Sequence, residues 1–329
     1  MEVINQQPLL SICIPTYNRA KYLEKTLPEI IRQVEEINRK DQLEVLVSDN
    51  CSCDNTSDIV CELEQLYPIT YIKNPINIGP DGNFINCFNK ARGKYVWLLG
   101  DDDLILKDSI KEIMKIISEE DYGLVHIDCE NSDGKNEAID DINFFLSNVS
   151  YWITFISANI FRSDIVKKIK VTEELKRSFM LQVPYFLTSA TSYKKNYLLR
   201  RPILGESLAN KSNGGYNLFK VFVQNHLGFW KKMVDDHKIS MECYEYVKKD
   251  TYLHFLRGYV YQLLLLRQNL KKNNIRKGKK GGFYIDHGWE ILYKTYSKNL
   301  YFWISFVKFP LYYLNWQRKR LAKLLHQSI

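Results

Sequence analysis

Short apolar runs alternate with stretches of helical periodicity along the first hundred residues of the chain. Apolar runs at residues 9–14, 44–48, 69–73 and 95–99 each end at a polar or glycine-bearing turn, which predicts buried strands. Between them, apolar positions at intervals of three and four predict helices over residues 19–34, 56–66 and 83–90. The resulting βαβαβαβ order predicts a parallel sheet with right-handed crossovers and one ligand crevice.

The last of these apolar runs leads into three consecutive carboxylates. Gly100 ends the run, and Asp101, Asp102 and Asp103 follow at the C-terminal end of the predicted strand, where open α/β sheets bind ligands. Because adjacent carboxylates repel one another, the cluster predicts a shared Mg²⁺ or Mn²⁺ ion with nucleotide phosphates in its coordination shell. The alternative is that these acids cap a helix predicted over residues 104–118.

Polar residues also follow the other predicted strands. Thr16, Asp49, Asn77 and Gly79 are expected to converge with the aspartates at one edge of the sheet, although each alone also fits an ordinary turn. No GxGxxG follows the first strand and no GxxxxGK[ST] is present, which argues against a dinucleotide enzyme or a P-loop NTPase. The sequence also lacks GxSxG, HExxH and paired CxxC motifs.

Composition is that of an ordinary globular protein, but the charge is unevenly spread. The 329 residues are 45% hydrophobic and 26% charged, with a net charge of +8. Residues 247–329 hold 17 Lys and Arg against 3 Asp and Glu, so this basic end is expected to meet an anionic surface. Seven cysteines without a CxxC pair, and a start that does not read as a signal peptide, predict a reducing, cytoplasmic compartment.

Four motifs carry a resemblance to a known family. They are residues 11–19 (SICIPTYNR), 47–50 (VSDN), 77–83 (NIGPDGN) and 98–103 (LLGDDD). Together they resemble the inverting family-2 glycosyltransferases of GT-A fold, and within them the abequosyltransferase-like branch that works on bacterial surface polysaccharides. The resemblance covers about residues 8–130 and implies an α/β fold of GT-A type, with a mostly parallel sheet flanked by helices.

The resemblance also implies roles for individual residues. Asp103, together with Asp101, would hold a divalent cation that bridges the diphosphate of a nucleotide-sugar donor. Pro15, Thr16 and Tyr17 would line the nucleobase and ribose pocket, and Asp49 would hydrogen-bond the base. Asn77, Gly79 and Asp81 would flank the nucleotide, and Asp102 would approach its ribose.

Glycosyl transfer further requires a base that deprotonates the acceptor hydroxyl. In this family it is often an Asp or Glu well downstream of the aspartates, but residues 179–190 contain no acid. Asp128 is the favoured candidate because it closes a strand predicted over residues 123–127. The other candidates are His126, Glu130, Glu173 and Glu206.

The rest of the chain predicts an acceptor half and a helical extension. Strands are expected over residues 151–161 and 197–204, and a glycine-containing junction at 213–215 predicts a domain boundary. Residues 1–212 would then form the catalytic domain, with residues 1–130 as its nucleotide-sugar half and residues 131–212 as its acceptor half. Residues 213–329 would form a basic, aromatic, helical region.

An aromatic stretch at residues 299–316 is followed by a basic cluster at 317–320. The stretch is too short and too interrupted to span a bilayer, which needs about 20 apolar residues. It fits a helix lying in the interface of an anionic membrane, here the inner face of the cell membrane, or else a helix packed on the protein. Nucleic acid is not an expected partner, since no recognisable RNA or DNA module accompanies the basic residues 271–280.

The leading hypothesis is therefore a metal-dependent inverting glycosyltransferase of hexosyl- or deoxyhexosyltransferase type. It would move a sugar from a nucleotide-diphosphate sugar to a glycan or lipid-linked glycan at the membrane. Nucleotidyl transfer is a weaker alternative, because it calls for a glycine-rich loop after the first strand. A membrane-associated nucleotide-sugar or glycan binding subunit without turnover is the non-enzyme alternative, and it would show affinity but no product.

Overall fold

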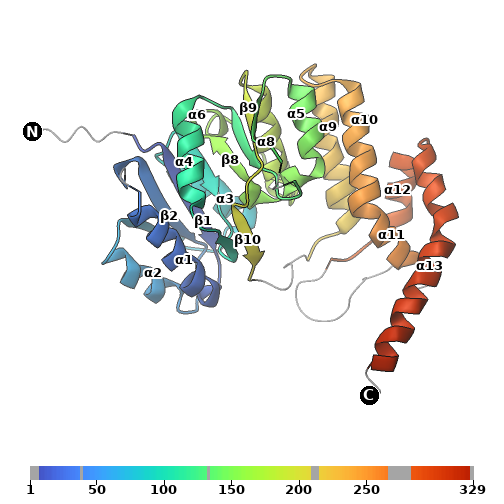
Figure 1. Cartoon of the computed structure of the whole chain (residues 1–329), viewed down its shortest axis with the longest axis horizontal. Helices are drawn as coiled ribbons and strands as arrows, with labels where there is room; N and C mark the ends of the chain where they lie inside the picture. Colours follow the sequence, from blue (N-terminus) through green and yellow to red (C-terminus); the bar gives the residue numbers. More distant parts are fainter. Residues whose placement is uncertain (1–6, 38–39, 132–133, 209–214, 266–282, 327–329) are drawn as a thin grey trace, which may run out of the picture. The chain divides into compact units, whose positions relative to one another are not determined.

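The computed structural model describes residues 7–37, 40–131, 134–208, 215–265 and 283–326. The chain divides into two compact units, Met1–Asn210 and Lys211–Ile329, hereafter unit 1 and unit 2. Unit 1 contains the strands and the predicted site, and the described part of unit 2 is almost entirely helical (Figure 1).

Unit 1 is built on an eight-stranded sheet that is mostly parallel, as predicted. Six strands run in one direction, and only β7 and β8 run against their neighbours. The apolar runs of the sequence form its centre, where Ile12 lies beside Val45 on one side and Trp97 on the other. In spatial order the strands are β3 (Ile69–Lys73), β2 (Leu43–Asp49), β1 (Leu10–Thr16), β4 (Tyr95–Leu98), β8 (Asn159–Arg162), β6 (Leu124–Ile127), β9 (Asn196–Leu199) and β7 (Glu137–Ile139).

Helices cover both faces of this sheet because the strands present apolar side chains alternately to each face. Leu10, Ile12 and Ile14 join the core beneath α1 (Ala20–Glu35), α2 (Thr56–Glu64) and α4 (Ser109–Glu119). Cys13 points the other way and contacts the Cys87 carbonyl of α3 (Gly79–Lys90). On that second face α3 packs beside α8 (Gln182–Thr191), and α6 (Ser163–Val166) packs on α8. The remaining helices of unit 1 are α5 (Ile142–Val149) and α7 (Glu173–Lys176).

The helix predicted over residues 104–118 begins later than expected. Residues Asp103–Ile105 form a short strand, β5, that pairs antiparallel with β10 (Leu204–Ser207), and α4 starts only at Ser109. The two strands lie about a hundred residues apart in sequence, so local periodicity did not reveal their pairing. The predicted strand 197–204 is likewise divided between β9 and β10. The three aspartates therefore do not cap a helix, and that alternative is wrong.

The prediction of a strand over residues 151–161 is also wrong for most of this segment. Two 3₁₀ turns, Ser150–Thr154 and Ile156–Ala158, precede the short strand β8. Side chains satisfy the carbonyls that these turns expose: Trp97 Nε1 donates to the Ser157 carbonyl at 2.7 Å, and Asn159 Nδ2 donates to the Phe155 carbonyl at 2.8 Å. These partners stabilise turns over a segment whose composition favours a strand.

Unit 2 is an array of helices around an aromatic core. The ring of Tyr252 lies 4.9 Å from that of Tyr296 and 5.5 Å from that of Phe302. None of the described helices combines the length and apolarity needed to cross a membrane. Most of the predicted junction at 213–215, and all of the basic run 271–280, lie outside the described residues. The helices are α9 (His226–Asp235), α10 (Met241–Asp250), α11 (Arg257–Leu265), α12 (Gly288–Tyr296) and α13 (Leu300–His326), with π-helical turns at Lys220–Asn225 and Thr251–Leu256.

Candidate active site

Asp101 and Asp102 lie in a tight turn after β4, and Asp103 is the first residue of β5. We call residues 100–103 the aspartate turn. Ser157 Oγ accepts a hydrogen bond from the Gly100 N–H at 2.9 Å and donates one to Asp103 Oδ2 at 2.6 Å. A side chain at Gly100 would displace the Asp103 carboxylate, because its Cβ would lie 2.7 Å from Asp103 Oδ2. The glycine that ends the apolar run thus allows the close approach of this carboxylate to the backbone.

Asp101 is held by the last residue of β1 and by a residue that follows the strand. Thr16 Oγ1 donates to Asp101 Oδ2 at 2.7 Å, and Arg19 Nη1 forms an ion pair with Asp101 Oδ1 at 3.0 Å. The same guanidinium reaches Asp102 Oδ2 through Nη2 at 3.1 Å, and Ser207 Oγ donates to that oxygen at 2.9 Å. The protein thus supplies a cation of its own to two of the three carboxylates.

Arg19 was not assigned to the site from the sequence, although it lies within the first family motif. A signal was present, since Arg19 follows the end of β1 by three residues and β1 pairs directly with β4. Its guanidinium also stacks over the ring of Tyr22 with 4.7 Å between the guanidinium carbon and the ring centroid. This contact holds the side chain against α1 and orients it toward the aspartates.

Burial makes the remaining negative charge costly. It raises the pKa of the Asp101 carboxyl to about 7, against the opposing effects of the Arg19 charge and the Thr16 hydrogen bond. Burial also raises the pKa of the Asp103 carboxyl, and the hydrogen bond from Ser157 opposes the rise. A divalent cation at this turn would favour the ionised forms of both groups.

The arrangement limits how a cation could be held. Among the described residues no three His, Cys, Asp or Glu side chains form a metal-binding group. Asp101 uses both carboxylate oxygens within the protein, whereas the hydrogen bonds that Asp103 receives from described side chains come from the hydroxyls of Ser157 and Ser207. An oxygen-only donor set with one protein carboxylate and the oxygens of a diphosphate fits Mg²⁺ or Mn²⁺, which commonly take one or two carboxylates plus substrate phosphates. The residues present therefore fit such an ion, with Asp103 as the better ligand.

Asp49 ends β2 at the same edge of the sheet and is completely buried. Its Oδ1 accepts from the Ser52 N–H at 2.8 Å and its Oδ2 accepts from the Tyr71 hydroxyl at 2.7 Å. Burial and the nearby Asp49 carboxylate raise the pKa of Tyr71, so its hydroxyl keeps its proton and remains a donor. A nucleobase that bonds Asp49 must therefore share the carboxylate with Tyr71 or displace its hydroxyl.

The loop after β3 is fastened to β2 through Asn50. Its Nδ2 donates to Asn77 Oδ1 at 2.9 Å and to the Gly79 carbonyl at 3.1 Å, and its Oδ1 accepts from the Ile78 N–H at 2.9 Å. Gly79 has a φ of +77°, a conformation that side chains of L residues rarely adopt. These contacts bring Asn77, Gly79 and the start of α3 to the edge where Asp49 lies.

Two further predicted residues lie in or beside the turn that ends β1. Pro15 is partly buried within the strand, while the ring of Tyr17 directly after it is 43% exposed. An exposed aromatic ring at the C-terminal edge of a sheet offers a face on which a nucleobase can stack. Of the residues predicted to contact the nucleotide at the first strand, Tyr17 thus has an accessible side chain.

Asp128 lies farther along the same edge, at the end of β6. In the sheet, β8 lies between β6 and β4. Its Oδ2 forms an ion pair with Arg200 at 3.1 Å and its Oδ1 accepts from the Asn131 N–H at 3.1 Å. Both oxygens of the predicted base are therefore already engaged by protein groups.

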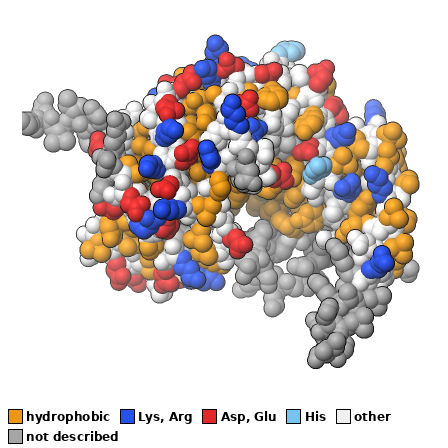
Figure 2. All heavy atoms as spheres, in the orientation of Figure 1, with side chains coloured by type: hydrophobic (Ala, Val, Ile, Leu, Met, Phe, Trp, Pro, Cys, Tyr) orange, Lys and Arg blue, Asp and Glu red, His pale blue; other side chains and the backbone are white. Residues whose placement is uncertain are grey.

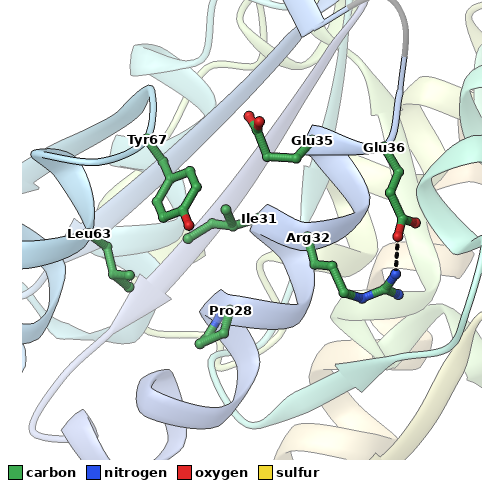
Figure 3. Close-up of a pocket in the computed structure, with 7 residues that line it drawn as sticks. All are labelled: Pro28, Ile31, Arg32, Glu35, Glu36, Leu63 and Tyr67. Atoms are coloured by element: carbon green, nitrogen blue, oxygen red, sulfur yellow. Dashed lines mark hydrogen bonds and ion pairs between the residues drawn. The ribbon is translucent and has the colours of Figure 1, made fainter.

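A hollow on the surface of unit 1 lies between α1 and the segment that links α2 to β3 (Figure 3). Arg32 in its wall forms ion pairs with Glu29 and Glu36 of the same helix region, so its charge is balanced locally. Because α1 runs back from the C-terminal edge of the sheet, this hollow lies toward the opposite edge from the aspartate turn. Its lining residues are Pro28, Ile31, Arg32, Glu35, Glu36, Leu63 and Tyr67.

Curated relatives match about a third of the chain. The abequosyltransferase RfbV of Salmonella typhimurium is 43% identical over 104 residues, which are 31% of this chain and 30% of the relative. The GalNAc(5)-diNAcBac-PP-undecaprenol β-1,3-glucosyltransferase of Campylobacter jejuni is 36% identical over 122 residues, which are 36% of this chain and 37% of the relative. The chain thus spans about a third of the length of each of these two relatives.

Solved structures share the fold. The Staphylococcus aureus TarS fragment in complex with UDP-GlcNAc aligns over 78% of this chain and 75% of its own length, with a TM-score of 0.59 at 20% identity. The mannosyltransferase PcManGT of Pyrobaculum calidifontis in complex with GDP-Man and Mn²⁺ aligns over 80% of this chain and 77% of its own length, with a TM-score of 0.55 at 15% identity. The GT-A fold predicted from the sequence is confirmed.

The sequence profile described as glycosyl transferase family 2 matches residues 11–198, which is more than half of the chain. That span includes β1, β2, the loop fastened by Asn50 and the aspartate turn. The predicted family and its link to the abequosyltransferases are confirmed. The chain belongs to glycosyl transferase family 2.

Proposed function

We propose that this chain moves a sugar from a nucleotide-diphosphate sugar to a glycan or lipid-linked glycan, with inversion at the anomeric carbon, in the synthesis of bacterial surface polysaccharide. The observation that carries the proposal is the buried aspartate turn at the C-terminal edge of β4, joined by Arg19 and Thr16. A relative named as an abequosyltransferase and one named for an undecaprenol-linked acceptor support the donor and acceptor classes.

Each part of the edge has a role in this reaction. The exposed ring of Tyr17, with Pro15 and Thr16, lines the nucleobase and ribose pocket, and Asp49 hydrogen-bonds the base. Asn77, Gly79 and Asp81 flank the nucleotide. These roles rest on the family motifs and on the convergence of the corresponding elements at one edge of the sheet.

The aspartate turn would serve the diphosphate end of the donor. Asp102 approaches the ribose, Asp103 is the main protein ligand of the cation, and Asp101 stabilises the turn and supports that site. Asp103 would hold a Mn²⁺ or Mg²⁺ ion, which would supply positive charge to the leaving diphosphate. Arg19 adds a fixed positive charge beside the same turn.

The test is a calorimetric titration of UDP, CDP, GDP and dTDP, each with Mn²⁺ and again with a chelator. We expect one nucleotide to bind tightly in the presence of Mn²⁺ and to lose most of its affinity with the chelator. The same nucleotide attached to a sugar should then be turned over. Binding that is identical with and without the chelator would contradict the cation assignment.

We further propose that the chain works at the inner face of the cell membrane, held there through unit 2. A division into compact units at Asn210 and Lys211 supports the boundary proposed at residues 212–213. Along α13, exposed apolar side chains recur at intervals of three and four residues, which puts them on one face of the helix. We call these residues the α13 stripe: Leu300, Trp303, Ile304, Val307, Leu311 and Leu314.

The opposite face of α13 is packed within unit 2. Phe302 is buried, Ser305 Oγ lies 2.6 Å from the Tyr252 hydroxyl, and the ring of Tyr312 lies 4.6 Å from that of Tyr261. The packed-helix interpretation fits this face, and we propose the interfacial interpretation for the α13 stripe. In Figure 2 the described part of α13 has hydrophobic side chains with Lys and Arg among them.

The proposed occupant of the α13 stripe is an anionic lipid surface. Val307 and Leu311 are 78% and 71% exposed, and Lys308 and Arg318 are exposed on the same helix. Tryptophan, tyrosine and basic side chains together favour the headgroup region of an anionic bilayer. Co-sedimentation with vesicles of phosphatidylglycerol and phosphatidylcholine, compared with phosphatidylcholine alone, tests this, and equal recovery with both would contradict it.

A further inference from the structure

One buried carboxylate of unit 1 lacks the partners that the others have. Asp81, in the first turn of α3, is 6% exposed and accepts a hydrogen bond from the Phe179 N–H. Its Oδ2 is buried, and no described group hydrogen-bonds to it. Among the described carboxylates, Asp81 alone has a buried oxygen in this state. Because leaving a buried polar atom unpaired costs free energy, such an atom calls for an explanation beyond folding.

The surroundings of Asp81 place it at the edge of the sheet that carries the site. The rings of Phe88 in α3 and Tyr185 in α8 stack with their centroids 4.7 Å apart. Seven residues before Phe88 in the sequence, Asp81 accepts the hydrogen bond from Phe179, which lies six residues before Tyr185. The two helices therefore run side by side in the same direction, with their N-terminal ends together. The start of α3 is fastened to the end of β2 through the Gly79 carbonyl and Asn50, next to Asp49.

The segment before α8 directs a backbone N–H group toward the Asp81 carboxylate. Phe179 has a φ of +54°, an uncommon conformation for a residue with a bulky side chain, and its N–H points to Asp81. Gln182, the first residue of α8, is tied by its Nε2 to the Thr154 carbonyl at 2.9 Å. The downstream segment thus contributes a backbone donor but no acid, and the carboxylate comes from α3 opposite it.

We propose that Asp81 is the general base of the transfer reaction, an inference that rests on the proposed glycosyltransferase function. As the acceptor oxygen forms its bond to the anomeric carbon, its O–H bond breaks and the proton passes to Asp81 Oδ2. The bond from the anomeric carbon to the diphosphate breaks at the same time, and its electron pair leaves with the nucleotide diphosphate. Atoms and charge balance without a covalent enzyme intermediate or another reactant.

The protonation behaviour of Asp81 agrees with this geometry. Burial raises the pKa of its carboxyl to about 7, and the Phe179 N–H opposes the rise. No charged side chain among the described residues shifts this pKa, which is set by burial and by the backbone hydrogen bond. A carboxylate that titrates near neutral pH accepts a proton more readily than an ordinary one and is still largely ionised just above that pH. Asp128, by contrast, is committed to Arg200.

The first experiment compares Asp81→Asn with Asp128→Asn and with Asp164→Asn, an exposed carboxylate on α6. The probes are UDP-glucose, CDP-glucose, dTDP-glucose and GDP-mannose with Mn²⁺ and water as acceptor, with nucleoside diphosphate release as the signal. We expect Asp81→Asn to lower kcat by about 10²- to 10⁴-fold, and we expect a much smaller change in KM, which would come from the position of Asp81 beside the nucleotide. The rise of wild-type kcat with pH through about 7 should be absent in this variant. The Asp164→Asn variant should match wild type.

A second measurement needs no substrate. Aspartate residues labelled with ¹³C at the carboxyl carbon are followed by NMR against pH in wild type and in Asp81→Asn. The signal missing from the variant should titrate near pH 7 in wild type. A midpoint near the usual value of about 4 would overturn the inference, even where no probe is turned over.

The outcomes separate the inference from the function on which it rests. If Asp81→Asn keeps turnover within threefold of wild type while Asp128→Asn loses it, Asp128 is the base and the glycosyltransferase proposal stands. If wild type binds none of UDP, CDP, GDP and dTDP with Mn²⁺, the proposed function fails and the base assignment fails with it. Retained nucleotide affinity with lost turnover in Asp81→Asn supports both.

Discussion

The aspartate turn of unit 1 and the aromatic interior of unit 2 are stabilised in different ways. At the turn, Asp101, Asp102 and Asp103 each accept directed hydrogen bonds or ion pairs from named neighbours. In unit 2, both ring nitrogens of His226 and the Trp230 indole N–H are buried with no hydrogen-bond partner among the described residues. Burial lowers the pKa of His226 to about 3, so the ring stays neutral there.

The difference fits the two kinds of binding that we propose for this chain. Directed hydrogen bonds fix the positions of charged groups within tenths of an ångström, which recognition of one nucleotide diphosphate requires. Aromatic packing is less directional, and it leaves the α13 stripe in solvent with no fixed geometry to match. A fluid lipid surface, which has no fixed shape, suits such a stripe. Four predictions test this contrast, from the largest expected effect to the smallest.

Replacing the proposed metal ligand is the most severe test of the directed contacts at the aspartate turn. Asp103→Ala should reduce turnover by about 10³-fold or more and abolish the Mn²⁺-dependent part of nucleotide affinity, because the cation loses its main protein ligand. Calorimetry and product assays measure both effects. The matched control is Asp108→Asn, at the left-handed residue before α4, which should leave both unchanged. Unchanged turnover in Asp103→Ala would remove the metal assignment.

Polar substitution of the α13 stripe tests the non-directional side. The double variant Val307→Gln and Leu311→Gln should weaken binding to anionic vesicles by about 10- to 100-fold, since two exposed apolar side chains no longer enter the interface. Nucleotide affinity should stay the same. Phe302→Ala on the packed face is the matched control, and it should lower stability by about 3 kcal/mol while leaving the stripe intact. Vesicle binding equal to wild type in the double variant would favour a helix whose exposed face has no lipid role.

Replacing Arg19 with lysine separates charge from geometry. The guanidinium bridges two carboxylates with separate nitrogens, whereas a lysine ammonium is a point charge that reaches one of them well. We expect turnover to fall about 10-fold, with a change of only a few degrees in melting temperature. Arg19→Ala, which removes the charge as well, should fall further. Full activity in Arg19→Lys would show that the net charge at the turn is sufficient and that the bridging geometry is dispensable.

The smallest effect concerns stability against pH. The folded pKa of Asp81 lies well above the value of about 4 expected in the unfolded chain, so the folded state binds the proton more tightly. The contribution of Asp81 to stability is therefore fully present below about pH 4 and is lost as the pH rises through about 7. Asp81→Asn should melt close to wild type at pH 4 and several degrees higher at pH 8. A difference that does not depend on pH would contradict the raised pKa.

The order of elements in the nucleotide half could be predicted because each strand is a local apolar run. Residues 69–73 form β3 as predicted, and β1, β2 and β4 begin and end within two residues of their predicted limits. The predictions that were wrong concern segments whose structure depends on partners distant in sequence. Leu104 and Ile105 fit a helical pattern, but β10, about a hundred residues later, draws them into a two-stranded sheet. Local periodicity contains no information about such pairing.

The gathering of polar residues at one edge of the sheet was predictable for the same reason. Strand ends are local features, so Thr16, Asp49 and the aspartates could be assigned to one edge from the βα order. The ion pairs were not predictable, because Arg19 and Asp101 are separated by 82 positions in sequence and by only 3.0 Å between charged atoms. The unpaired oxygen of Asp81 likewise depends on which side chains do not reach it, and sequence spacing cannot reveal that.

The pairing of β5 with β10 gives the turn an internal reporter. The Leu208 N–H donates to the Asp102 carbonyl at 2.7 Å, directly after the strand that faces Asp103. The ¹⁵N chemical shift and exchange rate of this single peptide group therefore depend on the backbone of the turn. Two-dimensional NMR of wild type with each nucleotide could follow the arrival of a diphosphate through Leu208, with no label on the ligand and no change to any carboxylate.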